Sequence, residues 1–185
     1  KNIGFVENYG VVSHANLDGF ELDFGLFRSL NEFEKSHSDL MFDTDANGNV
    51  GQRIIVADRD DYSRSTSGEV RLSRAFVEGQ RRHKLIASVR GRSLKRSYGG
   101  SALIDLGASY SGREDFRPEP IASFGPKTFD SVSQMNFGLG YELRWQKVGE
   151  FSAGIQKLDY SKRVETPGGI LPETKDNGWL YSVNA

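Results

Sequence analysis

Apolar and polar residues alternate along several segments of this chain, which is the spacing of a β-strand with one apolar face. In the longest segment, Met135–Trp145, every odd position is apolar and no even position is. Shorter segments with this alternation, the first of them weaker, lie at about 5–15, 20–28, 67–77, 83–95 and 150–162. With a last strand beginning near Trp179, the pattern predicts an all-β chain of six to seven antiparallel strands.

Two segments depart from simple alternation. Within 150–162 the apolar residues move from odd to even positions, and a β-bulge near Gln156–Lys157 would explain this slip. Residues 26–40 are the best helix candidate, because Leu26, Leu30 and Phe33 have helical spacing. The polar and charged content of 26–40 makes a loop an equally good interpretation.

Short and long connections alternate between the predicted strands. The short ones are Asn16–Gly19, Glu78–Arg82 and Gln146–Gly149, and the long ones cover about 29–66, 96–131 and 163–178. Antiparallel strands joined in this way have all their tight turns at one end of the sheet. Loops above 30 residues are uncommon in compact soluble domains, whereas outer-membrane barrels combine short periplasmic turns with long extracellular loops. The connections therefore favour a meander that forms part of a transmembrane barrel.

The two faces of the predicted strands have different chemistry. One face is expected to meet lipid and carries Phe20, Leu22, Phe24, Leu85, Val89, Met135, Phe137, Leu139, Tyr141, Leu143 and Trp145. The other is expected to line a wet lumen and carries Glu69, Arg71, Ser88, Arg90, Arg92, Asn136, Glu142 and Arg144. Trp145 adjoins a tight turn, where it either belongs to an interfacial aromatic girdle or simply packs on the turn.

Composition excludes several classes of protein. The net charge of −1 and the absence of a basic face give no indication of nucleic-acid binding. The chain has no cysteine, which excludes disulfides, cysteine-ligated zinc and a thiol nucleophile. No segment has the ~18 consecutive apolar residues of a transmembrane helix. The 21 glycines and the 11% aromatic content favour strands and turns.

Candidate sites for metal ions or catalysis are few. The segment containing Asp43, Asp45, Asn47 and Asn49 has the spacing of a calcium loop, but Ile54 stands where the bidentate Glu should be. It is interpreted either as a polar Asx-type turn or as a weak calcium site. The three histidines lack metal spacing, and His83, beside two arginines at a tight turn, is expected to be solvated. We expect no catalytic residues, no cofactor and no enzyme activity.

The order of several short motifs resembles the barrel region of TonB-dependent receptors of the bacterial outer membrane. The motifs are Ser67–Arg74, Gly79–Arg92, Tyr98–Gly100, Phe124–Pro126, Gly138–Tyr141, Arg144–Trp145, Gly149–Glu150 and Gln156–Lys157. The resemblance covers about residues 5–185. It implies that residues 1–185 are one partial barrel domain within a barrel of 22 strands. The family's plug domain, TonB box and terminal aromatic residue are not in this sequence, so we expect an internal piece of a longer protein.

The resemblance also implies a function. Such receptors import a scarce nutrient across the Gram-negative outer membrane, using energy that the TonB complex transmits to the plug. Usual cargoes are ferric siderophores, haem, cobalamin, nickel or oligosaccharides. The implied partners are outer-membrane lipid, the plug, the TonB complex and a small nutrient. Two alternatives stay open: a soluble β-sandwich or carbohydrate-binding module, and a different outer-membrane barrel such as a porin or an enzyme.

Overall fold

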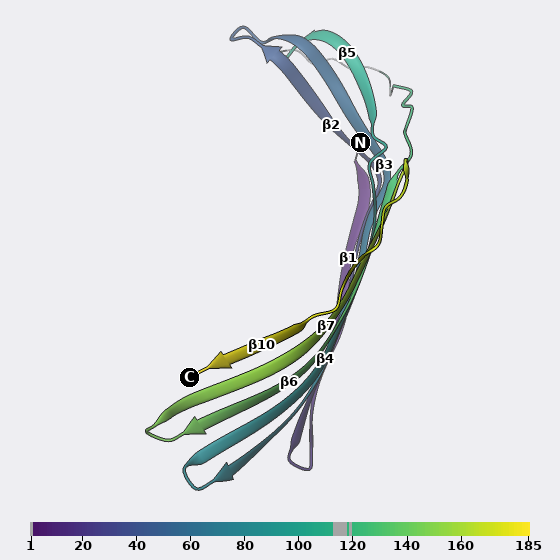
Figure 1. Ribbon diagram of the computed structural model, residues 1–185. Coiled ribbons are helices and arrows are strands. Elements are labelled where there is room, and N and C mark those ends of the chain that lie inside the picture. The colour runs from purple at the N-terminus through teal and green to yellow at the C-terminus, as the bar shows by residue number, and fades with distance from the viewer. Residues whose placement is uncertain (1, 113–117, 119) are drawn as a thin grey trace.

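A computed structural model describes residues 2–112, 118 and 120–185 of the chain, and within them every regular element is a strand. Figure 1 shows a single curved layer of strands. The strands are β1 (Ile3–Leu17), β2 (Phe20–Thr44), β3 (Asn49–Glu78), β4 (Arg81–Tyr98), β5 (Ala102–Tyr110), β6 (Thr128–Trp145), β7 (Gly149–Thr166), β8 (Gly169–Ile170), β9 (Thr174–Asp176) and β10 (Trp179–Asn184).

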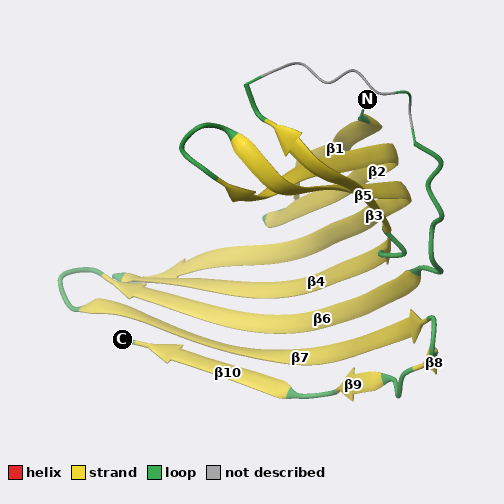
Figure 2. Cartoon of the chain, turned by 90° about the horizontal axis from the view of Figure 1, so that it is seen from above, coloured by secondary structure: helices red, strands yellow, loops and turns green. Residues whose placement is uncertain are grey.

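The strands form one open antiparallel sheet with meander order. Neighbours along the sheet follow the order β1-β2-β3-β4-β6-β7-β10, so seven strands lie on the main path. The remaining three are additions beyond it: β5 pairs with β3, and β8 and β9 pair with β7 (Figure 2). The predicted all-β class and antiparallel meander are confirmed.

Tight turns join the strand pairs at one end of the sheet. Asp18 and Gly19, with φ of 48° and 81°, connect β1 to β2, and Gly79, with φ of 59°, begins the turn from β3 to β4. Lys147, with φ of 60°, lies in the turn from β6 to β7. Asp-Gly suits the first turn because two-residue hairpins of this kind need positive φ at both central positions. The other connections lie at the opposite end of the sheet, as predicted, but the one between β2 and β3 is short, so the predicted alternation of short and long connections does not hold there.

The prediction of a long loop at 29–66 is wrong, and so is the helix candidate at 26–40. Both segments belong to β2 and β3, which continue as a long hairpin to a turn at Asp45–Gly48. These strand extensions carry polar or charged residues on both faces, so they lack the alternation that marks a strand with one buried face. The two extensions are held together by backbone hydrogen bonds between the strands, and the spacing of apolar residues gives no indication of such bonds.

The expected loop at 96–131 also contains a strand. β5 pairs with the distal part of β3 through an irregular register between Val50 and Ile54. This pairing encloses the apolar side chains of Val50 and Ala102, which are 2% and 3% exposed. Residues 113–117 and 119 of the same connection lie outside the described part of the chain.

The expected bulge near Gln156–Lys157 is not present. β6 and β7 pair without a shift from Phe129↔Glu165 to Trp145↔Gly149. The change of phase comes from side-chain chemistry, because Lys157 occupies the face that carries apolar residues elsewhere and Leu158 occupies the other face. A change in polarity along a regular strand therefore looked like a change in backbone register.

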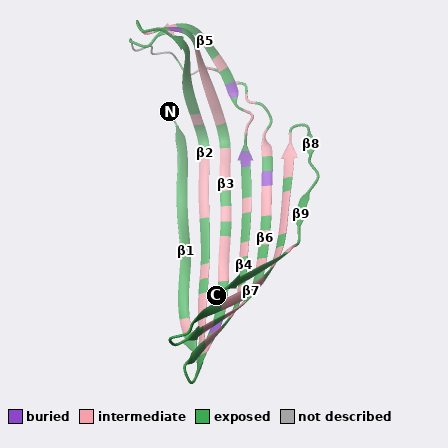
Figure 3. Ribbon diagram, turned by 60° about the vertical axis from the view of Figure 1, so that its left-hand side comes forward, coloured by how far each residue is buried: buried purple, intermediate pink, exposed green. Residues whose placement is uncertain are grey.

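The sheet has almost no hydrophobic core. Within the described ranges, Val50 and Ala102 are the buried apolar side chains, whereas Leu139, Phe137 and many other large apolar residues are exposed. Figure 3 shows that most residues of the main strands are intermediate or exposed and that few are buried. No helix of the described residues is long and apolar enough to cross a membrane.

Candidate functional site

The strand register places all eleven predicted lipid-facing residues on one side of the sheet, which we call the apolar face. Phe20, for example, lies in one row with Leu85 and Tyr141, and Leu22 lies in the next row with Leu139. Phe24, Val89 and Phe137 share a third row. Met135, Leu143 and Trp145 have the same parity on β6. The apolar face is therefore continuous across β2, β3, β4 and β6.

All eight predicted lumen-facing residues lie on the opposite side, which we call the polar face. Arg71 pairs in register with Ser88, and Glu69 pairs with Arg90, which in turn pairs with Asn136. Arg92 lies next to Gln134 on this face, Glu142 next to Lys84, and Arg144 next to Arg82. The structure thus separates the two predicted sets completely, while what each face meets stays a prediction.

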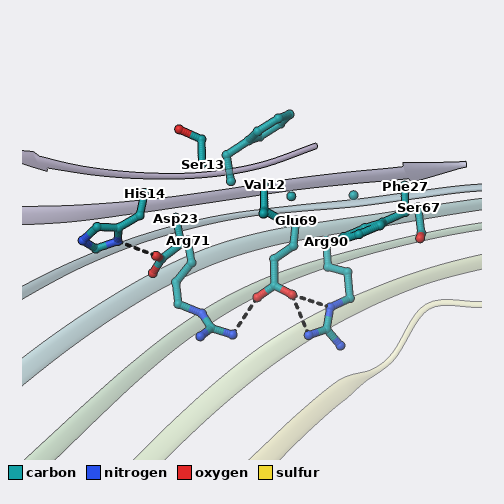
Figure 4. A pocket seen from close by; sticks show the side chains of 12 residues that line it. Val12, Ser13, His14, Asp23, Phe27, Ser67, Glu69, Arg71 and Arg90 are labelled. Atoms are coloured by element: carbon teal, nitrogen blue, oxygen red, sulfur yellow. Dashed lines mark hydrogen bonds and ion pairs between the residues drawn. The ribbon is translucent and has the colours of Figure 1, made fainter. Parts of the chain in front are cut away.

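Glu69 is the centre of the polar face. Its Oε1 accepts a hydrogen bond of 2.8 Å from Arg71, and its Oε2 accepts bonds of 3.0 and 2.7 Å from Arg90 Nε and Nη2 (Figure 4). The second contact has the forked geometry that orients a guanidinium firmly. Two cations around one carboxylate leave this part of the face with a net positive charge.

Further polar contacts continue the network toward the tight turns. His14 Nδ1 lies 2.8 Å from Asp23 Oδ1 on the wall of the pocket in Figure 4. Lys84 Nζ reaches Glu21 at 3.4 Å across β3, and Ser73 donates to the same carboxylate at 3.1 Å. Such a ladder of charges is stable beside water and costly in a dry core. The ladder is therefore consistent with the prediction that the polar face meets water.

A cluster of aromatic rings lies on the apolar face beside the tight turns. Phe76 and His83 are stacked with ring centroids 4.7 Å apart, and His83 Nδ1 lies 2.7 Å from the hydroxyl of Tyr141. The guanidinium of Arg81 lies 4.2 Å from the centre of the Trp145 ring. The expectation that His83 is solvated is wrong, since its side chain is 13% exposed. Its odd position in the alternating segment 83–95 was the signal that placed it on this face.

The candidate calcium loop forms the tip of the β2–β3 hairpin. Asp45 accepts hydrogen bonds of 2.9 Å from the backbone amides of Asn47 and Asn49, and one of 2.7 Å from the Asn49 side chain. These bonds hold the pKa of the Asp45 carboxyl below its usual value. The carboxylate thus caps its own turn, which is the geometry of the Asx-type alternative. In the described part of the chain no three acidic or histidine side chains gather as a metal site would require.

Neither the protein-family models nor the curated proteins contain a match to this chain. The two faces of the sheet and the residues that compose them are the features that bear on its function.

Proposed function

We propose that this chain forms part of the wall of a β-barrel in the outer membrane of a Gram-negative bacterium, with the apolar face toward lipid and the polar face toward the lumen. We further propose that the barrel belongs to a TonB-dependent receptor that imports a scarce nutrient. The observation that carries the first proposal is the direction in which the apolar residues cross the sheet.

The centre of the apolar residues shifts steadily from strand to strand. It lies at Val11 on β1, Phe24 on β2, Ala87 on β4 and Ala153 on β7. The register row of Val11 meets β7 at Asp159, six residues from Ala153. Six residues amount to about 20 Å along the strands, and the five steps between strands to about 24 Å across them. The apolar band therefore crosses the register rows at about 40°.

This angle equals the tilt of strands in outer-membrane barrels, about 35–45° from the barrel axis. If the apolar band lies flat in a membrane, the strands of this sheet are tilted by that amount. The longest apolar run, Met135–Trp145, covers about 33 Å of strand and hence about 25 Å of height at 40°. An apolar band of about 25 Å is the height that such barrels present to lipid.

The single layer supports the barrel over a soluble sandwich. A sandwich buries its apolar face against a second sheet about 10 Å away. None of the strands in the described ranges lies over the apolar face, and Leu139 in its centre is 64% exposed. The hydrocarbon core of a bilayer would cover the apolar face without a second sheet.

The TonB-dependent assignment rests on the ordered motifs of the sequence. In that family the polar wall surrounds a plug, and the long hairpins on the outside help to capture the nutrient. The ion-paired arginines Arg71 and Arg90 would then line the lumen beside the plug. The TonB complex would supply the energy for import through the plug, and the wall itself would perform no chemistry.

Labelling of single cysteines tests the two faces directly, because the chain has no cysteine of its own. The protein is expressed from its complete gene with Leu139→Cys on the apolar face or Asn136→Cys on the polar face. In isolated outer membranes we expect a water-soluble maleimide to modify Asn136→Cys and to spare Leu139→Cys. Equal modification of both, in a protein recovered from the soluble fraction, would refute the barrel.

Uptake tests the transporter assignment. Cells that lack the complete gene are supplied with single iron complexes, cobalamin, nickel or oligosaccharides at limiting concentration. We expect uptake of one of them to fall, and to fall equally when the proton-motive force is collapsed. Suppose that uptake of every cargo is unchanged while both cysteine variants are labelled as expected. The transporter assignment would then be refuted, and the chain would belong to a different kind of outer-membrane barrel.

A further inference from the structure

Three cations lie on the apolar face just beyond the apolar band, on the side of the long hairpins. They are Arg28 on β2, Arg64 on β3 and Lys95 on β4, and all three are exposed. Their strands are neighbours in the sheet. The last apolar row, which contains Leu26 and Met135, lies one to two rows away, or about 7–14 Å along the strands. We call Arg28, Arg64 and Lys95 the cationic patch.

The patch concentrates charge of one sign. Arg64 and Lys95 are directly opposite each other in the register of β3 and β4, an arrangement that destabilises a sheet. Arg64 forms an ion pair of 2.5 Å with Glu32 and lies over the ring of Tyr62. Arg28 and Lys95 have no ion pair with any described residue, and Glu7, on β1 in the row of Arg64, has none either. Glu32 thus neutralises one of the three cations.

Hydroxyl groups surround the cations on the same face. Thr66 pairs in register with Arg28 and with Ser93, and Lys95 pairs with Ser131. Arginine and lysine beside short hydroxyl side chains are donors that phosphate oxygens accept well. The patch therefore has the chemistry of a phosphate site, although it lies on a broad surface next to apolar side chains.

We infer that the cationic patch binds the phosphorylated headgroup of a membrane lipid. The inference rests on the proposed function, because it needs the apolar face to meet a bilayer. A lipid satisfies both parts of the surface at once: its phosphate neutralises Arg28, Arg64 and Lys95, and its acyl chains cover the adjoining row of Leu26 and Met135. A free phosphate ion would use the cations alone.

Lipid binding by the complete protein in a zwitterionic detergent tests the inference. The probes are lipid A with two phosphates, phosphatidylcholine and inorganic phosphate, and bound lipid is measured by native mass spectrometry. Each surface cation contributes about fivefold to the binding of anionic lipid, so the double variant R28Q/K95Q should bind lipid A about thirtyfold more weakly. Binding of phosphatidylcholine should not change. Arg96→Gln is the matched control, since it removes a charge beside Lys95 on the polar face.

Three results would overturn the inference: unchanged lipid A affinity in R28Q/K95Q, an equal loss in Arg96→Gln, or inorganic phosphate displacing lipid A at equal concentration. Labelling of Leu139→Cys in membranes separates these results from a failure of the proposed function. If Leu139→Cys is protected from the maleimide, the barrel stands and the lipid site alone is refuted. If it is labelled, the proposed function has failed.

Discussion

Single residues in this sheet matter mainly through what lies directly across from them in the register. With almost no buried side chains, there is no core whose packing a substitution could disturb. The contacts that remain are cross-strand pairs, ring-on-glycine contacts and ion pairs, each of them local. Effects of substitution should therefore differ sharply between neighbouring positions of the same residue type.

Glu69→Ala should destabilise the folded protein by about 1 kcal/mol, because it leaves Arg71 and Arg90 facing each other without their shared carboxylate. Partial exposure of all three side chains keeps the effect at this level. The free energy of unfolding in urea, measured on the complete protein in vesicles, checks it. Glu150→Ala is the control: it breaks the more exposed pair with Arg144 and should cost less than about 0.5 kcal/mol.

Gly10→Ala should destabilise the protein by about 1–3 kcal/mol. A Cβ at this position would overlap the Phe27 ring and would lie 2.8 Å from the backbone oxygen of Leu26. Gly140→Ala is the matched control, because its Cβ would meet Ile86 at an ordinary 3.6 Å and should change stability by less than about 0.5 kcal/mol. Equal losses in the two variants would mean that the ring contact is not decisive. Unfolding in urea gives both values.

At the scale of elements, sequence reasoning succeeded where a strand has two chemically different faces. Met135–Trp145 alternates perfectly, and its place in the sheet and both of its faces were predicted. The extensions of β2 and β3 were missed because polar residues lie on both of their faces, as Ser38 and Asp39 do on β2, so periodicity carries no information there. β5 was missed for a related reason: its pairing with distal β3 joins segments about 50 residues apart that share no local signal.

The β2–β3 extension should lose stability in acid. A forked ion pair with Arg53 holds the pKa of the Asp39 carboxyl below its usual value. Because this pKa is lowered by folding, the ion pair stabilises the folded extension fully above the ordinary carboxyl pKa of about 3.9. That stabilisation is lost as the pH falls through the lower pKa that Asp39 has in the folded protein. The protection factors of the amides in 35–55, which allow for the chemical exchange rate at each pH, should therefore fall below about pH 4. Asp39→Asn should exchange faster at neutral pH and show a smaller acid effect; an unchanged acid effect would assign it to other groups.

At the scale of the whole molecule, stability should depend on depth within the apolar band. An arginine on the lipid face costs about 2–4 kcal/mol at the middle of the bilayer and about 0–1 near its surfaces. We therefore expect Leu139→Arg to lower the unfolding free energy in vesicles by the larger amount and Trp145→Arg by the smaller. The control is Gly140→Arg, next to Leu139 on the polar face, where an added Cβ would meet Ile86 at an ordinary 3.6 Å. A similar cost at 139 and 140 would contradict the assignment of the faces.

The oblique course of the apolar band also determines the width that each strand occupies along the circumference of a barrel. A strand tilted by about 40° takes up about 6 Å of circumference instead of its 4.8 Å spacing. The seven main strands would then form an arc of about 44 Å, and a ring of 22 such strands would be about 44 Å across. An opening of that width would pass large molecules indiscriminately. A ring of 22 strands at this tilt would therefore need an internal domain that closes it. Such a domain would pack against the charged rows of the polar face.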